Sequence, residues 1–161
     1  MAKAALSHQR FRRLCRAFGL MGWAAVVVTT LLILFQLVLL PVLAKVPASA
    51  HVFWVRNLPA IFYLYAVGVM SGAMIALSRG RLVQAVLVRA LRRVGVALAA
   101  GAVVAIVGVT NLLNWLGLPG GGYAHFDVAA LALLLVGGSL ILIAKVLDEA
   151  VALQAELDQF V

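Results

Sequence analysis

The stretch from Ala17 to Ala44, AFGLMGWAAVVVTTLLILFQLVLLPVLA, contains no charged side chain. A helix needs about 20 residues to cross the hydrocarbon core of a bilayer, and this run is longer. We therefore predict a transmembrane helix that tilts or projects beyond the bilayer, with Pro41 near its outer end.

A secretory signal peptide is the alternative for this stretch, because Ala48-Ser49-Ala50 is similar to a cleavage site. The apolar region of a signal peptide is only about 7–15 residues long, which is much shorter than this run. We therefore interpret the stretch as a retained membrane helix.

The composition of the whole chain agrees with this interpretation. Of its 161 residues, 66% are hydrophobic and 11% are charged, and a soluble domain of this length has too little interior to bury so much apolar surface. Two further uncharged runs lie at 57–78 and 94–116, and a fourth apolar run at about 126–147 is charged only near its ends. The sequence predicts an all-α membrane protein, a four-transmembrane-helix bundle that forms a single membrane domain over 1–161 and ends in a helical cytoplasmic tail at 148–161.

Basic residues are distributed unevenly between the connections. Most lie before the first span or between the second and third spans, whereas the outer connections contain only Lys45 and Arg56. Because basic residues favour the cytoplasmic side, both termini are predicted to be cytoplasmic. The same bias explains the net charge of +8, so we do not expect direct binding of nucleic acid.

The segment between the second and third spans combines basic and apolar residues. Its apolar side chains recur at helical spacing, while Arg89, Arg92 and Arg93 share another face. We predict a basic amphipathic helix over 79–93 that lies in the inner interface or extends the third span into the cytoplasm. Its arginines are candidates for binding anionic lipid head groups or a partner, and they are Arg79, Arg81, Arg89, Arg92 and Arg93.

The tail carries most of the acidic residues of the chain. A short heptad seam runs along it on a helix continuous with the fourth span, formed by Val146, Ala150, Leu153, Leu157 and Phe160. The simplest expectation is that this seam and the acidic groups close on the arginine-rich segment of the same chain. The alternative is a docking surface for a soluble partner or a second copy, with candidate residues Asp148, Glu149, Leu153, Glu156, Leu157 and Phe160.

Two patterns of small residues predict close contacts between helix backbones. One is Gly68-Val-Met-Ser-Gly72 in the second span, and the other is Ala97, Gly101 and Ala105 in the third. Small residues at this spacing let helices approach closely in lipid.

Few residues suggest chemistry. His51, His125 and Asp127 share the outer side and are weak candidates for a divalent metal site, solvated loop histidines being the default interpretation. The chain has no nucleophile elbow, phosphate loop, Cys-x-x-Cys or His-Glu-x-x-His motif. No ionisable residue lies in the middle of a predicted span, where ion pathways commonly place one. We therefore expect neither enzymatic activity nor a cofactor.

Two short stretches resemble a known family. Ser78-Arg-Gly-Arg-Leu-Val with Leu91-Arg-Arg-Val-Gly95, and the end of the chain from Leu147 to Val161, are similar to a bacterial four-span membrane protein family of unknown function catalogued as DUF 2975. The resemblance implies a multi-pass protein of the bacterial inner membrane. It also implies, by analogy, a membrane partner for a small helix-turn-helix regulator.

Three functions follow as hypotheses. The first is a non-enzymatic membrane protein that binds a cytosolic partner through the arginine-rich segment and the acidic tail. The second is an accessory subunit of a larger respiratory or transport complex, and the third is a small transporter or channel that works as a homo-oligomer.

Overall fold

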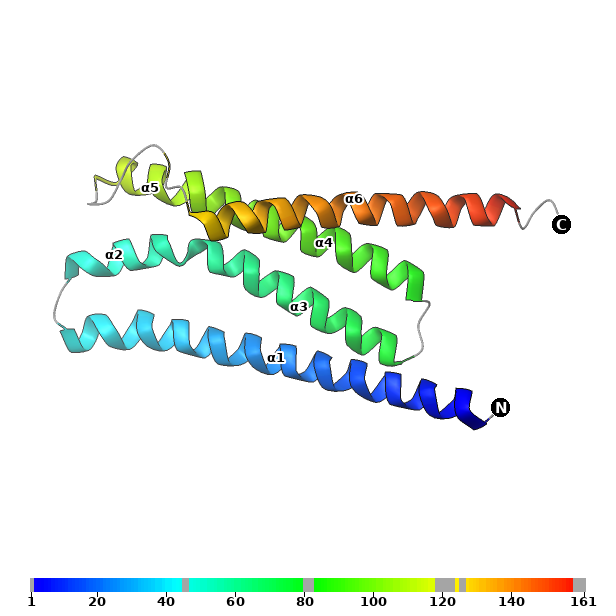
Figure 1. Cartoon of the computed structure of the whole chain (residues 1–161). Coiled ribbons are helices and arrows are strands. Elements are labelled where there is room, and N and C mark those ends of the chain that lie inside the picture. Colours follow the sequence, from blue (N-terminus) through cyan, green and yellow to red (C-terminus); the bar gives the residue numbers. More distant parts are fainter. Residues whose placement is uncertain (1, 45–46, 80–82, 118–123, 125–126, 158–161) are drawn as a thin grey trace.

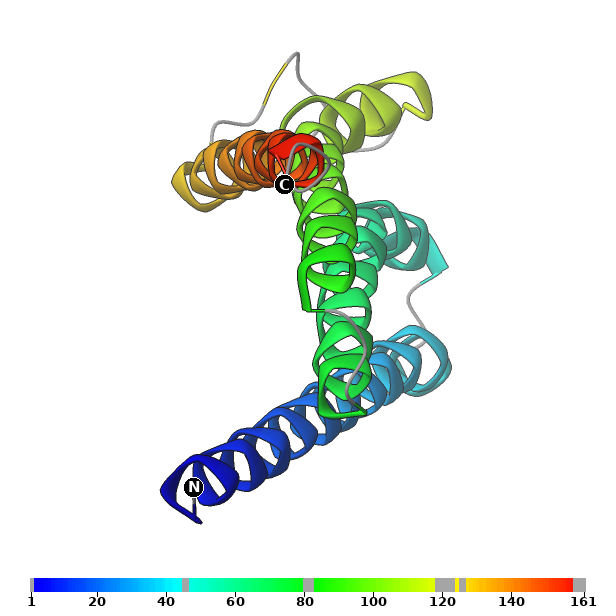
Figure 2. The ribbon, with the colours of Figure 1, turned by 90° about the vertical axis from the view of Figure 1, so that its right-hand side faces the viewer.

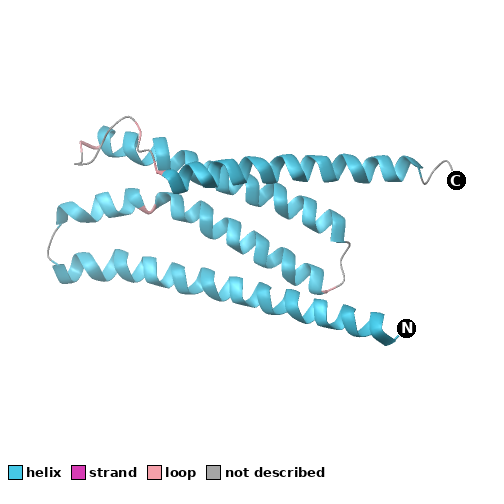
Figure 3. Ribbon diagram, viewed as in Figure 1, coloured by secondary structure: helices cyan, strands magenta, loops and turns pink. Residues whose placement is uncertain are grey.

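The computed structural model describes residues 2–44, 47–79, 83–117, 124 and 127–157. This part of the chain is helical and has no strand (Figure 3). Its elements are α1 (Ala2–Ala44), α2 (Pro47–Arg56), α3 (Leu58–Ser78), α4 (Val83–Val103), the π-helical turn η1 (Val104–Gly108), α5 (Val109–Trp115) and α6 (Val128–Leu157).

Four stretches of helix are long and apolar enough to cross a membrane, as predicted. They contain 24, 27, 30 and 26 residues, and at about 1.5 Å per residue each exceeds the roughly 30 Å of a hydrocarbon core. Their bounds are Arg13–Gln36, Val52–Ser78, Val86–Trp115 and Val128–Leu153.

The helices pack in chain order. Helix α1 lies along α3, α3 along α4, and α4 along α6 (Figure 1). Viewed along the helices, α1 and α6 lie at opposite ends of an open row (Figure 2). The four-helix arrangement is therefore confirmed, but the first and last spans do not close it into a ring. As a result, α1 and α6 each expose a broad apolar face.

One end of this row gathers the start of α1, the end of α3, the start of α4 and the end of α6 (Figure 1). We call it the basic end, because Arg13 and Arg16 lie in the first half of α1, Arg79 follows the last residue of α3 and Arg89 lies in the first half of α4. The opposite end carries α2 and α5.

The connection after the first span is helical, although the sequence suggested a polar loop there. Helix α2 leads into α3 through a bend, where the backbone and side-chain amides of Asn57 both donate to the carbonyl of Phe53, at 3.2 and 2.9 Å. Pro59 has no N–H to donate to the preceding turn, which explains why the helix bends here. The second candidate span consequently begins in α2, at Val52.

The third candidate span is interrupted by η1 but not broken. Helices α4, η1 and α5 follow one another without a gap from Val83 to Trp115. The helix ends directly after the predicted run 94–116, where Gly117 has a φ of 65° and its N–H donates to the carbonyl of Asn114 at 3.1 Å. A left-handed residue of this kind is a common helix terminator.

Small residues bring the helices close at three contacts. Gly95 of α4 and Gly137 of α6 face each other so tightly that a Cβ built on either would lie 2.7 Å from the carbonyl oxygen of the other. Gly101 packs on Tyr63 and Phe62 of α3, as the predicted packing face of the third span requires. On α1, both Gly19 and Gly22 lie against Ser71 of α3, with Gly19 also against Ile75.

The prediction for Gly68 and Gly72 was wrong within this chain. A Cβ at either position would meet no atom within 4 Å, so these glycines do not form a helix contact here. The spacing is that of a packing motif, but α1 and α4 approach other faces of α3.

Candidate functional site: the basic end

Arg79 ends α3 rather than starting an amphipathic helix. Its backbone N–H donates to the carbonyls of Ile75 and Ala76, both at 3.2 Å, so it caps the helix C-terminus, where a positive charge is favourable. The predicted basic helix therefore does not begin at Arg79. Arg81, another predicted site residue, lies outside the described residues.

A basic cleft of about 370 Å³ lies between α1 and α3 at this end. Arg13 and Arg16 of α1 line it together with Arg79, and Ser78 and Ile75 complete the wall. The contact between α1 and α3 thus brings together arginines that are far apart in the sequence.

The other three predicted arginines lie on α4, inside the third candidate span's own helix. Of the two predicted arrangements, the structure shows the continuous one, because α4 runs without a break from Val83 to Val103. Arg89, Arg92 and Arg93 are all exposed. All three line a single groove.

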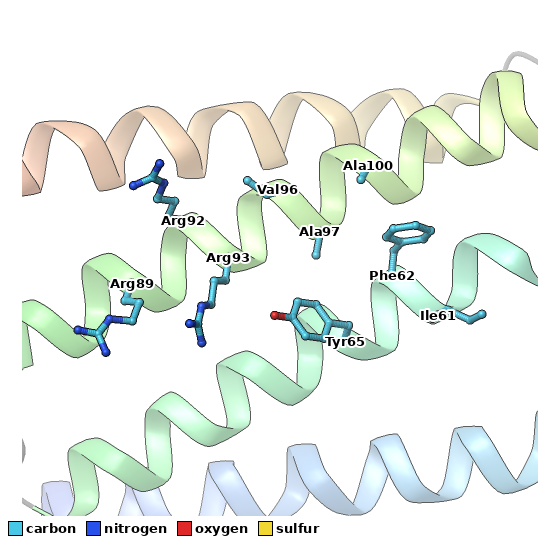
Figure 4. A pocket seen from close by; sticks show the side chains of 9 residues that line it. All are labelled: Ile61, Phe62, Tyr65, Arg89, Arg92, Arg93, Val96, Ala97 and Ala100. Atoms are coloured by element: carbon cyan, nitrogen blue, oxygen red, sulfur yellow. The ribbon is translucent and has the colours of Figure 1, made fainter.

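This groove lies between α3 and α4 and has a volume of about 620 Å³. Its basic part is formed by the three arginines, and its apolar part by residues such as Phe62, Val96 and Ala100. In Figure 4, Arg89 and Arg93 extend toward α3, Arg92 extends the other way, and the Tyr65 hydroxyl is turned toward Arg93. We call this cavity the α3–α4 groove.

The tail is a helix continuous with the fourth span, as predicted, and its backbone is described as far as Leu157. In Figure 1 the last turns of α6 project beyond the start of α4. Asp148 and Glu149 are exposed there, and Leu153 is 62% exposed. The side chains of Glu156 and Leu157, and the whole of Phe160, lie outside the described residues.

The simplest expectation, that the seam closes on the chain's own arginines, was wrong for the described residues. Val146 is 64% exposed and Ala150 is exposed. The packed face of α6 is instead marked by buried residues seven positions apart: Ala130, Gly137 and Ala144. At about 100° per residue, Val146 and Leu153 lie roughly 180–200° around the helix from Ala144, so they point away from α4.

The acidic groups do not pair with the arginines either. Among the described side chains, the ion pair present is Lys145 Nζ to Glu149 Oε1 at 4.0 Å, between exposed neighbours one turn apart on α6. An exposed pair of this type contributes little to stability. The acidic and basic groups of this end therefore both face outward.

Of the three candidate metal residues, the structure describes the side chain of Asp127 alone. The Asp127 carboxylate accepts the N–H of Ala129 at 3.1 Å, so it caps the N-terminus of α6. His51 lies on α2 with its side chain outside the described residues, and His125 lies outside them altogether. No group of three metal-ligating side chains is found among the residues described.

Polar side chains within the candidate spans bond to their own helices. Each hydroxyl donates to the carbonyl four residues earlier: Thr30 to Val26, Ser71 to Val67 and Ser139 to Leu135, at 2.7 to 2.9 Å. This is the structural role expected of them, since a hydroxyl in an apolar medium needs a partner.

Sequence reasoning missed the residues that α3 and α1 contribute. In the sequence, Tyr65 and Phe62 are indistinguishable from other residues of an apolar span. Arg13 and Arg16 indicated only which side of the membrane the N-terminus lies on. Nothing in the sequence pairs them with Arg93 or Arg79, because that pairing depends on which helix faces meet.

Comparison with protein-family models, curated proteins and solved structures finds no match to this chain. The resemblance to the four-span family catalogued as DUF 2975 therefore stays a prediction.

Proposed function

We propose that the chain is a non-enzymatic, multi-pass membrane protein that docks a soluble protein at its basic end. Its four candidate spans would lie in the inner membrane of a bacterium, with the basic end in the cytoplasm, since basic residues favour that side. The observation that carries the proposal is the projecting, unpacked end of α6.

The seam on α6 supports docking because its described side chains are apolar and exposed. Val146, Ala150 and Leu153 face away from α4, although a helix end that served only as an anchor would need no such stripe. A helix that presents apolar residues at positions i, i+4 and i+7 is a common mode of recognition in a partner's groove. The partner would cover these side chains.

The charges around the seam support a role in selecting the partner. Asp148 and Glu149 lie on the projecting helix, while Arg79 and Arg89 lie on the body of the same end, and neither set neutralises the other. Two nearby patches of opposite sign speed encounter with a partner of complementary pattern and disfavour other partners. On the family resemblance alone, a small helix-turn-helix regulator is the first partner to test.

The test compares soluble proteins captured by the full chain and by a chain truncated after Leu147, both reconstituted in lipid nanodiscs. A sharper pair is Leu153→Ser and its matched control Val151→Ser, which removes a similar apolar side chain from the opposite face of α6. We expect partner recovery to fall several-fold for the truncation and for Leu153→Ser but not for Val151→Ser. Equal recovery from the full and truncated chains would refute the proposal.

A second candidate is a subunit of a larger membrane complex. Gly68 and Gly72 favour it, because they leave open space along α3 into which a helix of another subunit fits. Co-purification with large membrane proteins in mild detergent, lost on Gly72→Leu, would support this candidate. Migration of the native protein only as a monomer or small homo-oligomer would count against it.

A further inference from the structure

The α3–α4 groove has two chemically different parts. Toward the basic end, Arg89, Arg92 and Arg93 supply three guanidinium groups, and none of the described side chains that line the groove is acidic. Toward the middle of the row the lining is apolar, from Val96 to Ala100 on α4 and from Ile61 to Tyr65 on α3. The groove is therefore amphipathic along the helix direction.

The groove opens onto the surface that the candidate spans would turn to lipid. Ile61, Tyr65 and Val96 line it, and each is more than half exposed. From Arg93 to Ala100 the apolar wall extends over seven residues, or about 10 Å at the rise of an α-helix. Its volume of about 620 Å³ lies within the range of roughly 300–1,000 Å³ that is usual for small-molecule sites.

The arginines are placed to hold one anionic group. Arg89 and Arg93 are one turn apart on α4, both extend toward α3, and the Tyr65 hydroxyl is turned toward Arg93 (Figure 4). Guanidinium groups bind phosphate oxygens through paired, charge-assisted hydrogen bonds. A phosphate between the two arginines would take the hydroxyl of Tyr65 as a third donor.

From these features we propose that the α3–α4 groove is a binding site for a single anionic phospholipid. Its phosphate binds Arg89 and Arg93 near the basic end, and an acyl chain runs along Val96 and Ala100 toward the middle of the row. Charge complementarity selects an anionic head group, and the apolar wall distinguishes a lipid from free phosphate. This site goes beyond the proposed function, since it uses neither the seam nor the acidic groups of α6.

The test uses the full chain in mild detergent and native mass spectrometry, with phosphatidylglycerol and phosphatidylcholine of identical acyl chains as probes. We expect one phosphatidylglycerol to bind about tenfold or more tighter than phosphatidylcholine, because both carry a phosphate but the quaternary ammonium of phosphatidylcholine would lie beside three arginines of the same charge. The variant Arg89→Gln/Arg93→Gln should lose that preference. Filling the apolar part with Ala100→Phe should weaken phosphatidylglycerol binding several-fold.

Two matched control variants distinguish binding in the groove from general electrostatic attraction between the lipid and the arginines. Arg13→Gln/Arg16→Gln removes the same charge from the same end but does not touch the groove, and Val103→Phe adds the same ring at an exposed position of α4 outside it. Both should bind phosphatidylglycerol like the parent chain. Because Arg89 and Arg93 are exposed, their variant should unfold in SDS at the parent's midpoint, so a loss of lipid reports on binding.

Three results would overturn the proposal. One is an equal loss of phosphatidylglycerol from the two double arginine variants, which would mean diffuse attraction. Another is displacement of the lipid by glycerol phosphate at the same concentration, which would mean a site for free phosphate. The third is a dimer that forms through the groove and disappears in Arg89→Gln/Arg93→Gln. The chain truncated after Leu147 must still bind the lipid, so this test and that of the proposed function fail independently.

Discussion

Replacing Gly137 with Ala should separate α6 from α4. The new Cβ would lie 2.7 Å from the Gly95 carbonyl oxygen and 2.8 Å from the Ala99 amide nitrogen, whereas ordinary contacts begin near 3.4 Å. The helices must therefore move apart by about 0.7 Å, the difference between these two distances. Both obstructing atoms belong to the backbone, so no side chain can turn away to make room.

The expected size of the effect follows from two opposing terms. Overpacking of a tight contact costs about 1–3 kcal/mol. Alanine is the better helix former by up to about 1 kcal/mol, which offsets part of that cost. We expect Gly137→Ala to lower the free energy of unfolding by about 1–2 kcal/mol, and Gly95→Ala to do the same. The double variant should cost less than the sum, because the first substitution already separates the helices.

The assay is reversible unfolding of the full chain in mixed micelles of mild detergent and SDS, followed by helical circular dichroism. Gly138→Ala is the matched control, since it lies next to Gly137 on α6 and its Cβ would meet nothing within 4 Å. Its stability should stay the same or rise by up to about 1 kcal/mol. If Gly137→Ala and Gly138→Ala change stability equally, the crossing described here is not the contact that holds α6.

Three further outcomes can be measured in the same way or in cells. Ser71→Leu should lower the free energy of unfolding by about 1–3 kcal/mol, because the leucine side chain would displace α1 at Gly19 and Gly22. Its control, Ser71→Ala, should change the free energy of unfolding in SDS by less than about 1 kcal/mol. Asp127→Ala should lower the free energy of unfolding by about 0.5–2 kcal/mol, because α6 loses its N-terminal cap. Asp127→Asn should stay close to the parent, since asparagine also caps helices. An equal loss in both variants would mean that Asp127 does not act as a cap. In a Cys15→Ala background, an impermeant maleimide added to intact cells should label Trp115→Cys but not Asp148→Cys, and the reverse pattern would invert the proposed orientation.

The four long apolar helices could be predicted from the sequence because apolar length is a local property. The end of the third span at Gly117 and the continuation of the fourth into the tail were predicted for the same reason. The helical connection α2 was not, because Pro47, His51 and Arg56 read as loop residues. Proline is well tolerated in the first turn of a helix, so the polar composition was the weaker guide.

The sequence could not predict which face of each helix contacts a neighbouring helix. Gly68 and Gly72 have the better-known spacing, yet Gly95 and Gly137, which belong to no shared motif, form a close contact between α4 and α6. Which side of a helix is covered depends on where its neighbours lie. The groove escaped prediction for the same reason, since Tyr65 and Arg93 are 28 positions apart in the sequence and meet only through the packing of α3 on α4.

The open row has a consequence for how the chain is made. The long helices contact one another in the order of the sequence, α1 with α3, α3 with α4 and α4 with α6. Each long helix after α1 therefore meets a neighbour that has already been synthesised, and no contact joins the first long helix to the last. Such near-sequential contacts favour rapid assembly. Under the proposed insertion into a membrane, the chain would enter as a series of helix hairpins, and α6 would arrive last with its end uncovered.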